Sequence, residues 1–312
     1  MNGAVKKMPD FSYYLVDVFT TNFFAGNQLA VFPNAEGIST VQMQKIAREL
    51  NISETSFVLP AKNKSNDKKI RIFTPAVELP MAGHPTIGTA YVLASRNLIE
   101  TNEGATKVVF EENVGDIGVT VHKLNGDVSK VEMEQPIPRF GDIYKDSDKI
   151  AKLLSLSAED IDLSLPIQSV SAGVPFLYVP LNSLSAMKKI KFRLDIWKDH
   201  FSAYEDFKHV FVFSREVEHK GSTIHSRMFA PAMGIPEDPA TGAASGPLGA
   251  YLVHYGVTKE NIDGKYQIVS EQGIEMGRAS FIDITILKKD DQISSVKIGG
   301  CSVDIGEGRL YL

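Results

Sequence analysis

The sequence predicts a mixed α/β (α+β) protein built from two similar lobes that arose by internal duplication. The stretch His84-Pro85-Thr86-Ile87-Gly88-Thr89-Ala90 shares the pattern x-Pro-x-x-Gly-x-Ala with Asp238-Pro239-Ala240-Thr241-Gly242-Ala243-Ala244, 154 positions further on. Four other segments recur in the same order, at offsets that rise from 147 to 159. Two repeats of this length indicate two domains of one kind and not a solenoid.

Each repeat combines strand-like segments with one helix-like segment in its middle. A proline near the start of a helix loses no hydrogen bond, because the N–H groups of the first turn have no intrahelical partner. We therefore expect a helix to begin at each copy of the paired pattern, with its proline in the first turn. The other matched pairs are AGNQLAVF (25–32) with AGVPFLYV (172–179), SFVL (56–59) with VFVF (210–213), RIFTPA (71–76) with RMFAPA (227–232), and Glu112 and Gly118 with Glu271 and Gly277.

Ahead of that central helix, a shorter helix is predicted in the first lobe. Ser39 and Gln42 have the spacing of a capping box, and Asn51 is a typical stop. One helical face would carry Met43, Ile46, Ala47 and Leu50. The turn 51–55 follows it directly. Enrichment in β-branched and aromatic residues predicts strands over 12–20, 56–59, 71–76, 107–123 and 129–136, with a helix over 85–96.

The change of composition after the first repeat sets the expected domain boundaries. We expect an N-terminal lobe over residues 1–140, a linker over 141–164 and a C-terminal lobe over 165–312. A last strand, over about 301–312, has no counterpart in the first half. It can therefore stay with the second lobe or return to the first.

Composition excludes several classes of protein. The 312 residues are 43% hydrophobic, which is enough for sizeable cores, and a net charge of −5 gives no electrostatic footprint for nucleic acid or a membrane surface. The single cysteine, Cys301, excludes an intramolecular disulfide and a cysteine-based zinc site. No signal-peptide pattern or membrane-length apolar run is present, so a cytoplasmic protein is expected.

The paired pattern also predicts a site. If the two lobes face each other, both helix N-termini point into one cleft, where backbone N–H groups can hold a carboxylate or enolate. The candidate proton handlers are His84, Asp238 and Glu54. Each also has an ordinary structural reading: Asp238 as a helix N-cap, His84 as a satisfied structural histidine, and Glu54 as a solvated loop acid.

Five stretches of this chain resemble the PhzF-like phenazine biosynthesis protein family, which has the diaminopimelate epimerase-like fold. They are DVFTTNFFAGNQLAVF, ISETSFV, RIFTPAVELPMAGHPTIGTAYVL, RMFAPAMGIPEDPATGAASGPLGAYLV and EQGIEMGRAS. These stretches run from about residue 12 to residue 282 in the family's order. The combination of GHPTxGxA with EDPATG is a specific signature.

This resemblance implies two lobes, each a curled, barrel-like sheet around a central helix, in a homodimer. It implies a cofactor-free isomerase without a metal, in which Glu54 moves a proton between ring carbons of a dihydro-hydroxyanthranilate. His84 and Asp238 match residues that line the family's site. The positions expected near the substrate are Ser53, Gly83, Gly242 and Ala243.

One departure from the family pattern concerns the substrate. Where the family often reads DPATGS, this chain has Ala243, so a hydroxyl that could bind or relay a proton is missing. Ser245 is two positions further on and would point elsewhere from a helix. Racemases of the same fold use two cysteines as acid and base, and the single Cys301 excludes that chemistry.

The first hypothesis is therefore a cofactor-independent isomerase that moves a proton within a small unsaturated or dihydroaromatic carboxylic acid. An alternative from another class is a non-catalytic metabolite-binding or protein-interaction role on the same fold, because fold alone does not settle function. A nucleotide-dependent dehydrogenase is disfavoured, since no G-x-G-x-x-G fingerprint follows the first strand.

Overall fold

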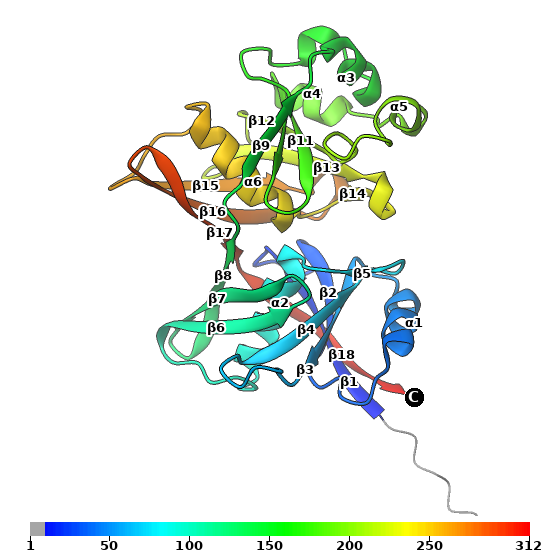
Figure 1. Cartoon of the computed structure of the whole chain (residues 1–312), viewed down its shortest axis with the longest axis vertical. Helices are drawn as coiled ribbons and strands as arrows, with labels where there is room; N and C mark the ends of the chain where they lie inside the picture. Colours follow the sequence, from blue (N-terminus) through cyan, green and yellow to red (C-terminus); the bar gives the residue numbers. More distant parts are fainter. Residues whose placement is uncertain (1–9) are drawn as a thin grey trace, which may run out of the picture. The chain divides into compact units, whose positions relative to one another are not determined.

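The computed structural model describes residues 10–312 and divides them into two compact units. Unit 1 holds the described residues up to Val18, then Gln28–Val131 and Ser302–Leu312; unit 2 holds Phe19–Asn27 and Glu132–Cys301. Each unit is a curled sheet packed against a central helix (Figure 1). Within residues 10–312 the strand pairing does not close into a barrel.

Unit 1 is a mixed sheet with one buried and one peripheral helix. Its elements are β1 (Asp10–Val18), β2 (Asn27–Phe32), α1 (Thr40–Leu50), β3 (Glu54–Leu59), β4 (Lys68–Phe73), β5 (Glu78–Leu79), α2 (Gly83–Ser95), β6 (Gly104–Glu112), β7 (Gly115–Leu124), the start of β8 (Asp127–Gln135), and β18 (Ser302–Tyr311). The strand order is β18–β1–β2–β3–β4–β6–β7, and β5 pairs with β4. The pairs β2–β3 and β4–β6 are parallel.

Unit 2 repeats this arrangement. Its elements are β9 (Arg139–Ile143), α3 (Ser147–Leu154), the 3-10 turn η1 (Ala158–Asp160), β10 (Gln168–Ser171), β11 (Pro175–Leu181), α4 (Leu184–Lys189), α5 (Leu194–His200), β12 (Val210–Ser214), β13 (Ile224–Ala230), η2 (Pro231–Met233), β14 (Ile235–Asp238), α6 (Gly242–His254), β15 (Lys265–Gln272), η3 (Ile274–Met276), β16 (Ser280–Lys289) and β17 (Gln292–Gly300). The strand order is β9–β10–β11–β12–β13–β15–β16–β17, with β11–β12 and β13–β15 parallel. Strand order and the two parallel pairs agree with unit 1, which confirms the duplication.

The edge strands β9 and β18 depart from a simple repeat. β9 follows the first repeat along the chain but pairs with β10 in unit 2. β18 follows the second repeat but pairs with β1 in unit 1, from Asp10 opposite Tyr311 to Val18 opposite Ser302 (Figure 1). Each repeat thus gives its last strand to the other unit. The stretch 141–164, expected as a linker, contains the end of β9, α3 and η1.

The central helices α2 and α6 are buried on nearly all sides. Eleven of the thirteen residues of α2 are buried, and it packs against β1, β3 and β7. A helix that is apolar all round belongs inside a protein. Gly88 permits the close approach, because a Cβ there would lie 2.6 Å from side-chain atoms of Leu29 and Val18.

The peripheral helix α1 covers the other face of the unit 1 sheet. Its capping box, buried face and Asn51 stop are as predicted, with Asn51 in the left-handed conformation at φ 50°. Phe57 on β3 stacks with Phe32 at 5.0 Å between ring centroids and packs beneath α1. Because side chains alternate along a strand, Glu54, three positions before Phe57, points to the opposite face, toward α2.

The strand register corrects two of the predicted matches between the repeats. Thr55 lies opposite Phe73 and Val210 lies opposite Phe229. The RIFTPA and RMFAPA match therefore places 56–59 level with 211–214, and the expected match of SFVL (56–59) with VFVF (210–213) is wrong by one residue. Lys69 lies opposite Glu111 in unit 1, and His225 lies opposite Glu271 in unit 2. The RIFTPA and RMFAPA match aligns Lys69 with His225, so Glu271 corresponds to Glu111. The expected match of Glu271 with Glu112 is wrong by one residue, and such a slip moves a side chain to the other face.

The expected match of Gly118 with Gly277 is also wrong, because the connection after β15 is longer than the one after β6. Residues 113–114 join β6 to β7, whereas 273–279, including η3, join β15 to β16. Gly277 lies in this longer connection, so it has no partner in β7. In the corrected alignment Glu112, the last residue of β6, corresponds to Gln272, the last residue of β15.

Candidate active site

Glu54 and His84 form a buried acid–base pair in unit 1. Glu54 is the first residue of β3 and His84 the second residue of α2, and both are at most 6% exposed. Glu54 Oε2 lies 3.0 Å from His84 Nε2. Glu54 Oε2 accepts no hydrogen bond of good geometry from a described residue. The pair can therefore hold a proton and pass it to a bound molecule.

The reading of Glu54 as a solvated loop acid is wrong. The expected turn 51–55 ends earlier than predicted, so Glu54 and Thr55 belong to β3. Their parallel partners are Leu29 and Ala30 on β2. This pairing fixes the direction of the Glu54 side chain and encloses it, since both neighbouring strands are buried at this level.

The start of α2 leaves backbone donors uncapped by its N-cap residue. Its N-cap is Ala82, which supplies no side-chain hydrogen bond, and Pro85 lies in the first turn as predicted. The helix begins at Gly83, two residues before the expected start. The first N–H groups of a helix have no intrahelical partner and carry a partial positive charge. This end of α2 suits a carboxylate or an enolate oxygen.

Asp238 is the centre of a buried hydrogen-bond network in unit 2. Asn27 Nδ2 donates to Asp238 Oδ1 at 2.9 Å, and Thr241 Oγ1 donates to Oδ2 at 2.6 Å. Gln272 Nε2 donates to the backbone oxygen of Asp238 at 2.7 Å. Asn27 and Gln272 have no exposed surface. Donors on both carboxylate oxygens fix the orientation of Asp238.

The expected helix start at Asp238-Pro239 is wrong. Asp238 ends β14, and α6 begins only at Gly242 with Thr241 as N-cap. The reading of Asp238 as an N-cap is also wrong. The chain stays non-helical here because Gln272 holds both the N–H of Thr241, at 3.1 Å, and its hydroxyl, at 3.0 Å.

The remaining predicted positions fall beside these two groups. Ser53 is half-buried directly before β3, and Gly83 is the buried first residue of α2. Gly242 is the buried first residue of α6, and the half-buried Ala243 follows it. Ser245 Oγ donates to the backbone oxygen of Thr241 at 2.9 Å, so its hydroxyl is engaged within the helix and does not replace the one missing at Ala243.

Sequence reasoning did not single out the supporting residues Asn27, Thr241 and Gln272, and it noted Glu112 only as the counterpart of Glu271. Asn27 lies inside the matched segment AGNQLAVF, and a polar residue in an otherwise apolar run was the available signal. Gln272 and Glu112 end corresponding strands, which only the strand register reveals. Their contacts join residues far apart in the chain.

A buried ion cluster in unit 2 holds the longer connection 273–279 in place. His225 Nδ1 lies 2.8 Å from Glu271 Oε1, and His225 Nε2 lies 2.9 Å from Glu275 Oε1. Burial opposes the charged imidazole, but hydrogen bonds with the two carboxylates raise the pKa of His225 to about 9. Burial likewise opposes the charge of Glu271, but hydrogen bonds from His225 and from two backbone N–H groups lower its pKa to about 2. The cluster therefore ties the connection 273–279 to β13 and β15.

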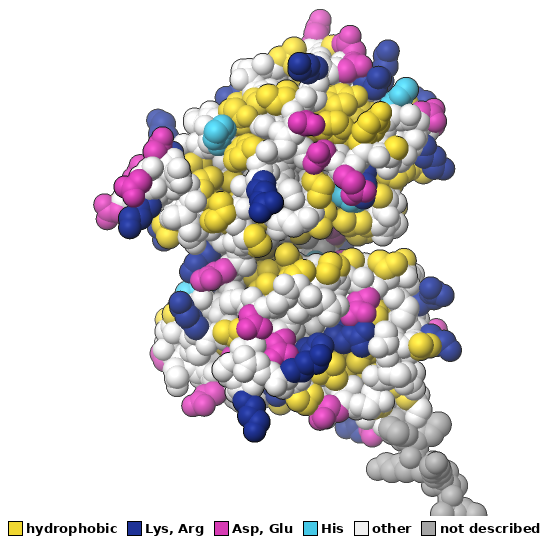
Figure 2. Space-filling view, in the orientation of Figure 1, with side chains coloured by type: hydrophobic (Ala, Val, Ile, Leu, Met, Phe, Trp, Pro, Cys, Tyr) yellow, Lys and Arg dark blue, Asp and Glu magenta, His cyan; other side chains and the backbone are white. Residues whose placement is uncertain are grey.

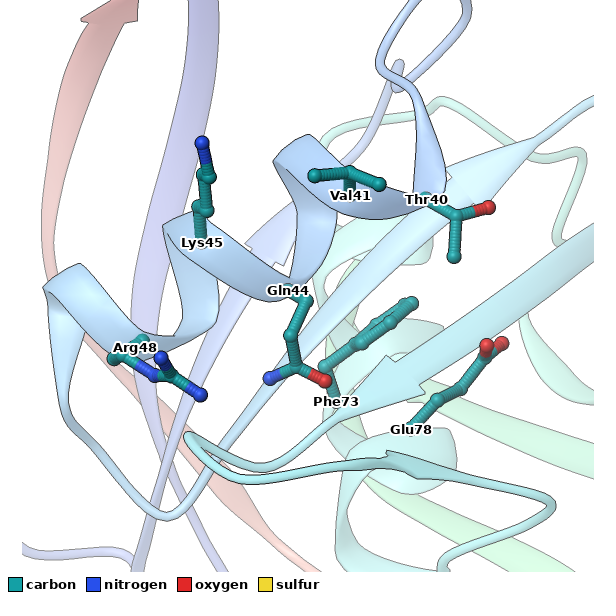
Figure 3. Close-up of a pocket in the computed structure, with 7 residues that line it drawn as sticks. All are labelled: Thr40, Val41, Gln44, Lys45, Arg48, Phe73 and Glu78. Carbon is teal, nitrogen blue, oxygen red and sulfur yellow. The ribbon is translucent and has the colours of Figure 1, made fainter.

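A surface pocket of about 360 Å³ lies beside α1 in unit 1. Figure 3 shows Gln44 of α1 and Phe73 of β4 facing the same space, with Arg48 at one end. Gln44 Nε2 donates to the backbone oxygen of Thr74 at 2.9 Å, which ties α1 to the connection after β4. None of the predicted site residues lines this pocket.

The surface carries charges of both signs. Figure 2 shows Lys and Arg side chains interspersed with Asp and Glu on the visible face of each unit. This agrees with the small negative net charge. Within residues 10–312, no helix is both long enough and apolar enough to cross a membrane.

Comparison with known proteins places the chain in a family and supports its fold. The family model of the phenazine biosynthesis-like proteins matches residues 16–308. An uncharacterized isomerase of Mesorhizobium japonicum is 36% identical over 304 residues, covering 96% of this chain and 99% of its own. The trans-2,3-dihydro-3-hydroxyanthranilate isomerase of Pseudomonas chlororaphis is 35% identical over 302 residues, covering 96% and 99%.

Solved structures agree. A PhzF-family phenazine biosynthesis protein of Bacillus anthracis superposes with a TM-score of 0.88 at 27% identity, covering 98% of this chain and 100% of that one. A hydroxyproline epimerase of Agrobacterium vitis has a TM-score of 0.64 at 13% identity over 97% of this chain and 93% of its own, a likeness of fold alone. The chain is therefore an isomerase-class enzyme with the epimerase-like α/β fold. It belongs to the phenazine biosynthesis-like protein family.

Proposed function

We propose that this protein is a cofactor-independent isomerase that moves a proton between two carbons of a small unsaturated or dihydroaromatic carboxylic acid. The observation that carries the proposal is the buried Glu54–His84 pair, with 3.0 Å between Oε2 and Nε2. The trans-2,3-dihydro-3-hydroxyanthranilate isomerases among its relatives support this class of substrate.

In the proposed reaction Glu54 acts first as a base and then as an acid. Its carboxylate takes a proton from a carbon next to the substrate's double bonds, and the electron pair of the broken C–H bond spreads into the conjugated acid. The protonated Glu54 then returns the proton to another carbon of the same system. The step is redox-neutral, and His84 steadies the carboxylate in both protonation states.

Asp238 has a different role in this proposal. Since Asn27 and Thr241 donate to its two oxygens, Asp238 suits orientation of a substrate hydroxyl or amine better than delivery of a proton. Gly83 at the start of α2, and Gly242 and Ala243 at the start of α6, would place backbone N–H groups around the substrate carboxylate. The common cleft for the two groups of residues stays a prediction from the duplication.

The test is carbon-bound deuterium incorporation in heavy water, followed by proton NMR with a panel of dihydroaromatic and unsaturated carboxylic acids. Glu54→Gln should slow exchange by roughly 10²–10⁴-fold, the usual contribution of a general acid–base group. Glu49→Gln changes an exposed glutamate on α1 and serves as the matched control. It should exchange like the wild type.

Two results would count against the proposal, and a third would narrow the choice of substrate. Equal exchange in the wild type and Glu54→Gln would show that Glu54 is not the acid–base group and would leave His84 or Asp238 as candidates. Acids that raise the melting temperature without exchanging would favour the metabolite-binding alternative. Exchange on trans-2,3-dihydro-3-hydroxyanthranilate that appears only in Ala243→Ser would show that the missing hydroxyl excludes this acid as the natural substrate.

A further inference from the structure

Glu112 is a buried carboxyl group at the start of α2 that the proposed reaction does not use. It is the last residue of β6 and is 7% exposed. Its Oε1 lies 2.5 Å from Thr86 Oγ1, and the N–H of Ala82 donates to the carboxyl group. Its Oε2 has no hydrogen-bond partner among the described residues. Ala82 and Thr86 are on either side of His84 in the first turn.

Counting protons assigns the protonation state of this carboxyl group. Thr86 Oγ1 also lies 2.7 Å from the backbone oxygen of Ala82. A hydroxyl carries one proton, and a carbonyl oxygen can only accept. If Thr86 donates to Ala82, the short contact with Glu112 needs a proton from Glu112. A neutral Glu112 satisfies both contacts, whereas a carboxylate would leave two acceptors competing for one proton.

Burial supports the same protonation state. Desolvation raises the pKa of Glu112 to about 7, from a usual value of 4.5, although Thr86 and Ala82 pull in the other direction. The charged form is disfavoured because no opposite charge replaces its lost hydration. No charged side chain contributes to this shift.

The corresponding residue of unit 2 performs the same task with a group that cannot ionise. Gln272 accepts from the N–H of Thr241 through Oε1, and it donates through Nε2 to Thr241 Oγ1 and to the backbone oxygen of Asp238. A neutral carboxylic acid, like a primary amide, offers one acceptor and one donor on neighbouring atoms. In unit 1, Glu112 at the end of β6 contacts the turn that carries His84. In unit 2, Gln272 at the end of β15 contacts the turn that carries Asp238.

We propose that Glu112 is a positioning residue for His84 that works as a neutral carboxylic acid, donating to Thr86 as Gln272 donates to Thr241. Loss of its proton would remove this donor and leave a buried charge at the turn that carries His84. The proposal rests on the proposed function only in assigning His84 to the reaction. The protonation state of Glu112 can be measured without a substrate.

Other ionisable groups near this turn must be separated from Glu112. α2 packs on β1, β3 and β7, and β6 pairs with β4 and β7. The ionisable residues on these elements and on α2 include Asp17, Glu54, Lys68, Lys69, Arg71, His84, Tyr91, Glu111, Asp116, His122 and Lys123. These residues are the same in Glu112→Gln and in the wild type. Their contributions to the pH dependence of the unfolding free energy therefore cancel when the two proteins are compared at each pH.

The first measurement is urea unfolding of the full chain between pH 4 and 8. Between pH 4.5 and 7 the folded state keeps a proton on Glu112 that the unfolded state has lost, so wild-type stability falls as pH rises. Glu112→Gln lacks this fall. Its unfolding equilibrium constant should therefore decrease relative to the wild type by up to roughly 300-fold across this interval, the difference between 4.5 and about 7 in pKa. Glu49→Gln should show no such trend.

The reciprocal variant Gln272→Glu should acquire a similar fall in stability as pH rises. A constant ratio between Glu112→Gln and the wild type at all pH values would overturn the assigned protonation state. So would failure of Glu112→Gln to fold, because the amide reproduces the donor and the acceptor of the neutral acid.

The second measurement tests positioning. In the wild type, the backbone amide NMR signals of His84 and Thr86 should shift with a step near pH 7 that Glu112→Gln lacks. Identical titration of these signals in both proteins would overturn the positioning role. Where an exchanging substrate is found, Glu112→Gln should retain exchange and extend it to higher pH. Absence of exchange in the wild type would refute the proposed function and leave both results on Glu112 standing.

Discussion

Asn27 contributes no atom to proton transfer in the proposed reaction, yet its amide fixes the carboxylate of Asp238. Nδ2 donates to Asp238 Oδ1 and also to the backbone oxygen of Ala240, at 2.9 and 3.0 Å. Removing the Asn27 amide takes one donor away from Asp238 Oδ1 and from the backbone oxygen of Ala240, and water does not replace it easily because the site is buried. An unmet buried hydrogen bond destabilises a protein by about 1–3 kcal/mol.

We expect Asn27→Ala to lower both the midpoint of urea unfolding and the rate of deuterium exchange. Asn27→Asp should be worse, since it keeps the shape but sets a second carboxylate against Asp238. Asn22→Ala, in the same segment but exposed, is the control and should change neither quantity much. An unchanged exchange rate in Asn27→Ala would show that the orientation of Asp238 does not affect the reaction.

At the scale of elements, the packing of α2 depends on the absence of a side chain at Gly88. A Cβ there would lie 2.6 Å from Leu29 Cδ2 and from Val18 Cγ2, which is closer than side chains tolerate. Gly88→Ala improves helix propensity but forces the helix off the sheet, and overpacking of this kind typically destabilises by about 1–3 kcal/mol. Ser95→Ala, at the exposed end of the same helix, should be neutral or slightly stabilising. Urea unfolding of the two variants tests this contrast.

The sequence pattern correctly predicted those elements whose boundaries depend on residues close together in the chain. The capping box of Ser39, the apolar face of α1 and the stop at Asn51 depend on neighbouring residues, and the structure has all three. The start of α6 was mispredicted because Pro239 fits a first helical turn by itself. Hydrogen bonds with Gln272, which β15 brings beside Thr241, and with Asn27 hold that turn in a non-helical form.

The candidate site was predictable to the same extent. Duplication drew attention to His84 and Asp238, Glu54 was a candidate beside a predicted strand end, and the resemblance to a family assigned it the proton transfer. Their supporting partners could not be found this way, since Asn27 meets Asp238 from 211 positions away. Glu112 was noticed but matched to Glu271, because the one-residue difference appears only in the pairing of β4 with β6 and of β13 with β15.

At the scale of the whole molecule, completion of the unit 1 sheet depends on β18. β18 pairs with β1 along its full length, so removing residues 302–312 would turn β1 into an unpaired edge. We expect the truncated chain to lose stability in unit 1 and to aggregate. A synthetic peptide of residues 300–312 should restore part of the wild-type urea midpoint, and a scrambled peptide of the same composition should not. A truncated chain that unfolds like the wild type would show that the β1–β18 pairing contributes little.

The place of β18 also bears on how the protein is made. Chains are synthesised from the N-terminus and domains generally fold as they emerge. Here the first described strand has to wait for the last, because the partner of Asp10 is Tyr311. While the ribosome translates the whole of the second repeat, β1 exposes an open edge in the cell. Unit 2, whose strands from β9 to β17 are consecutive in the chain, can complete its sheet first. The N-terminal half of this enzyme is then the last part to finish folding.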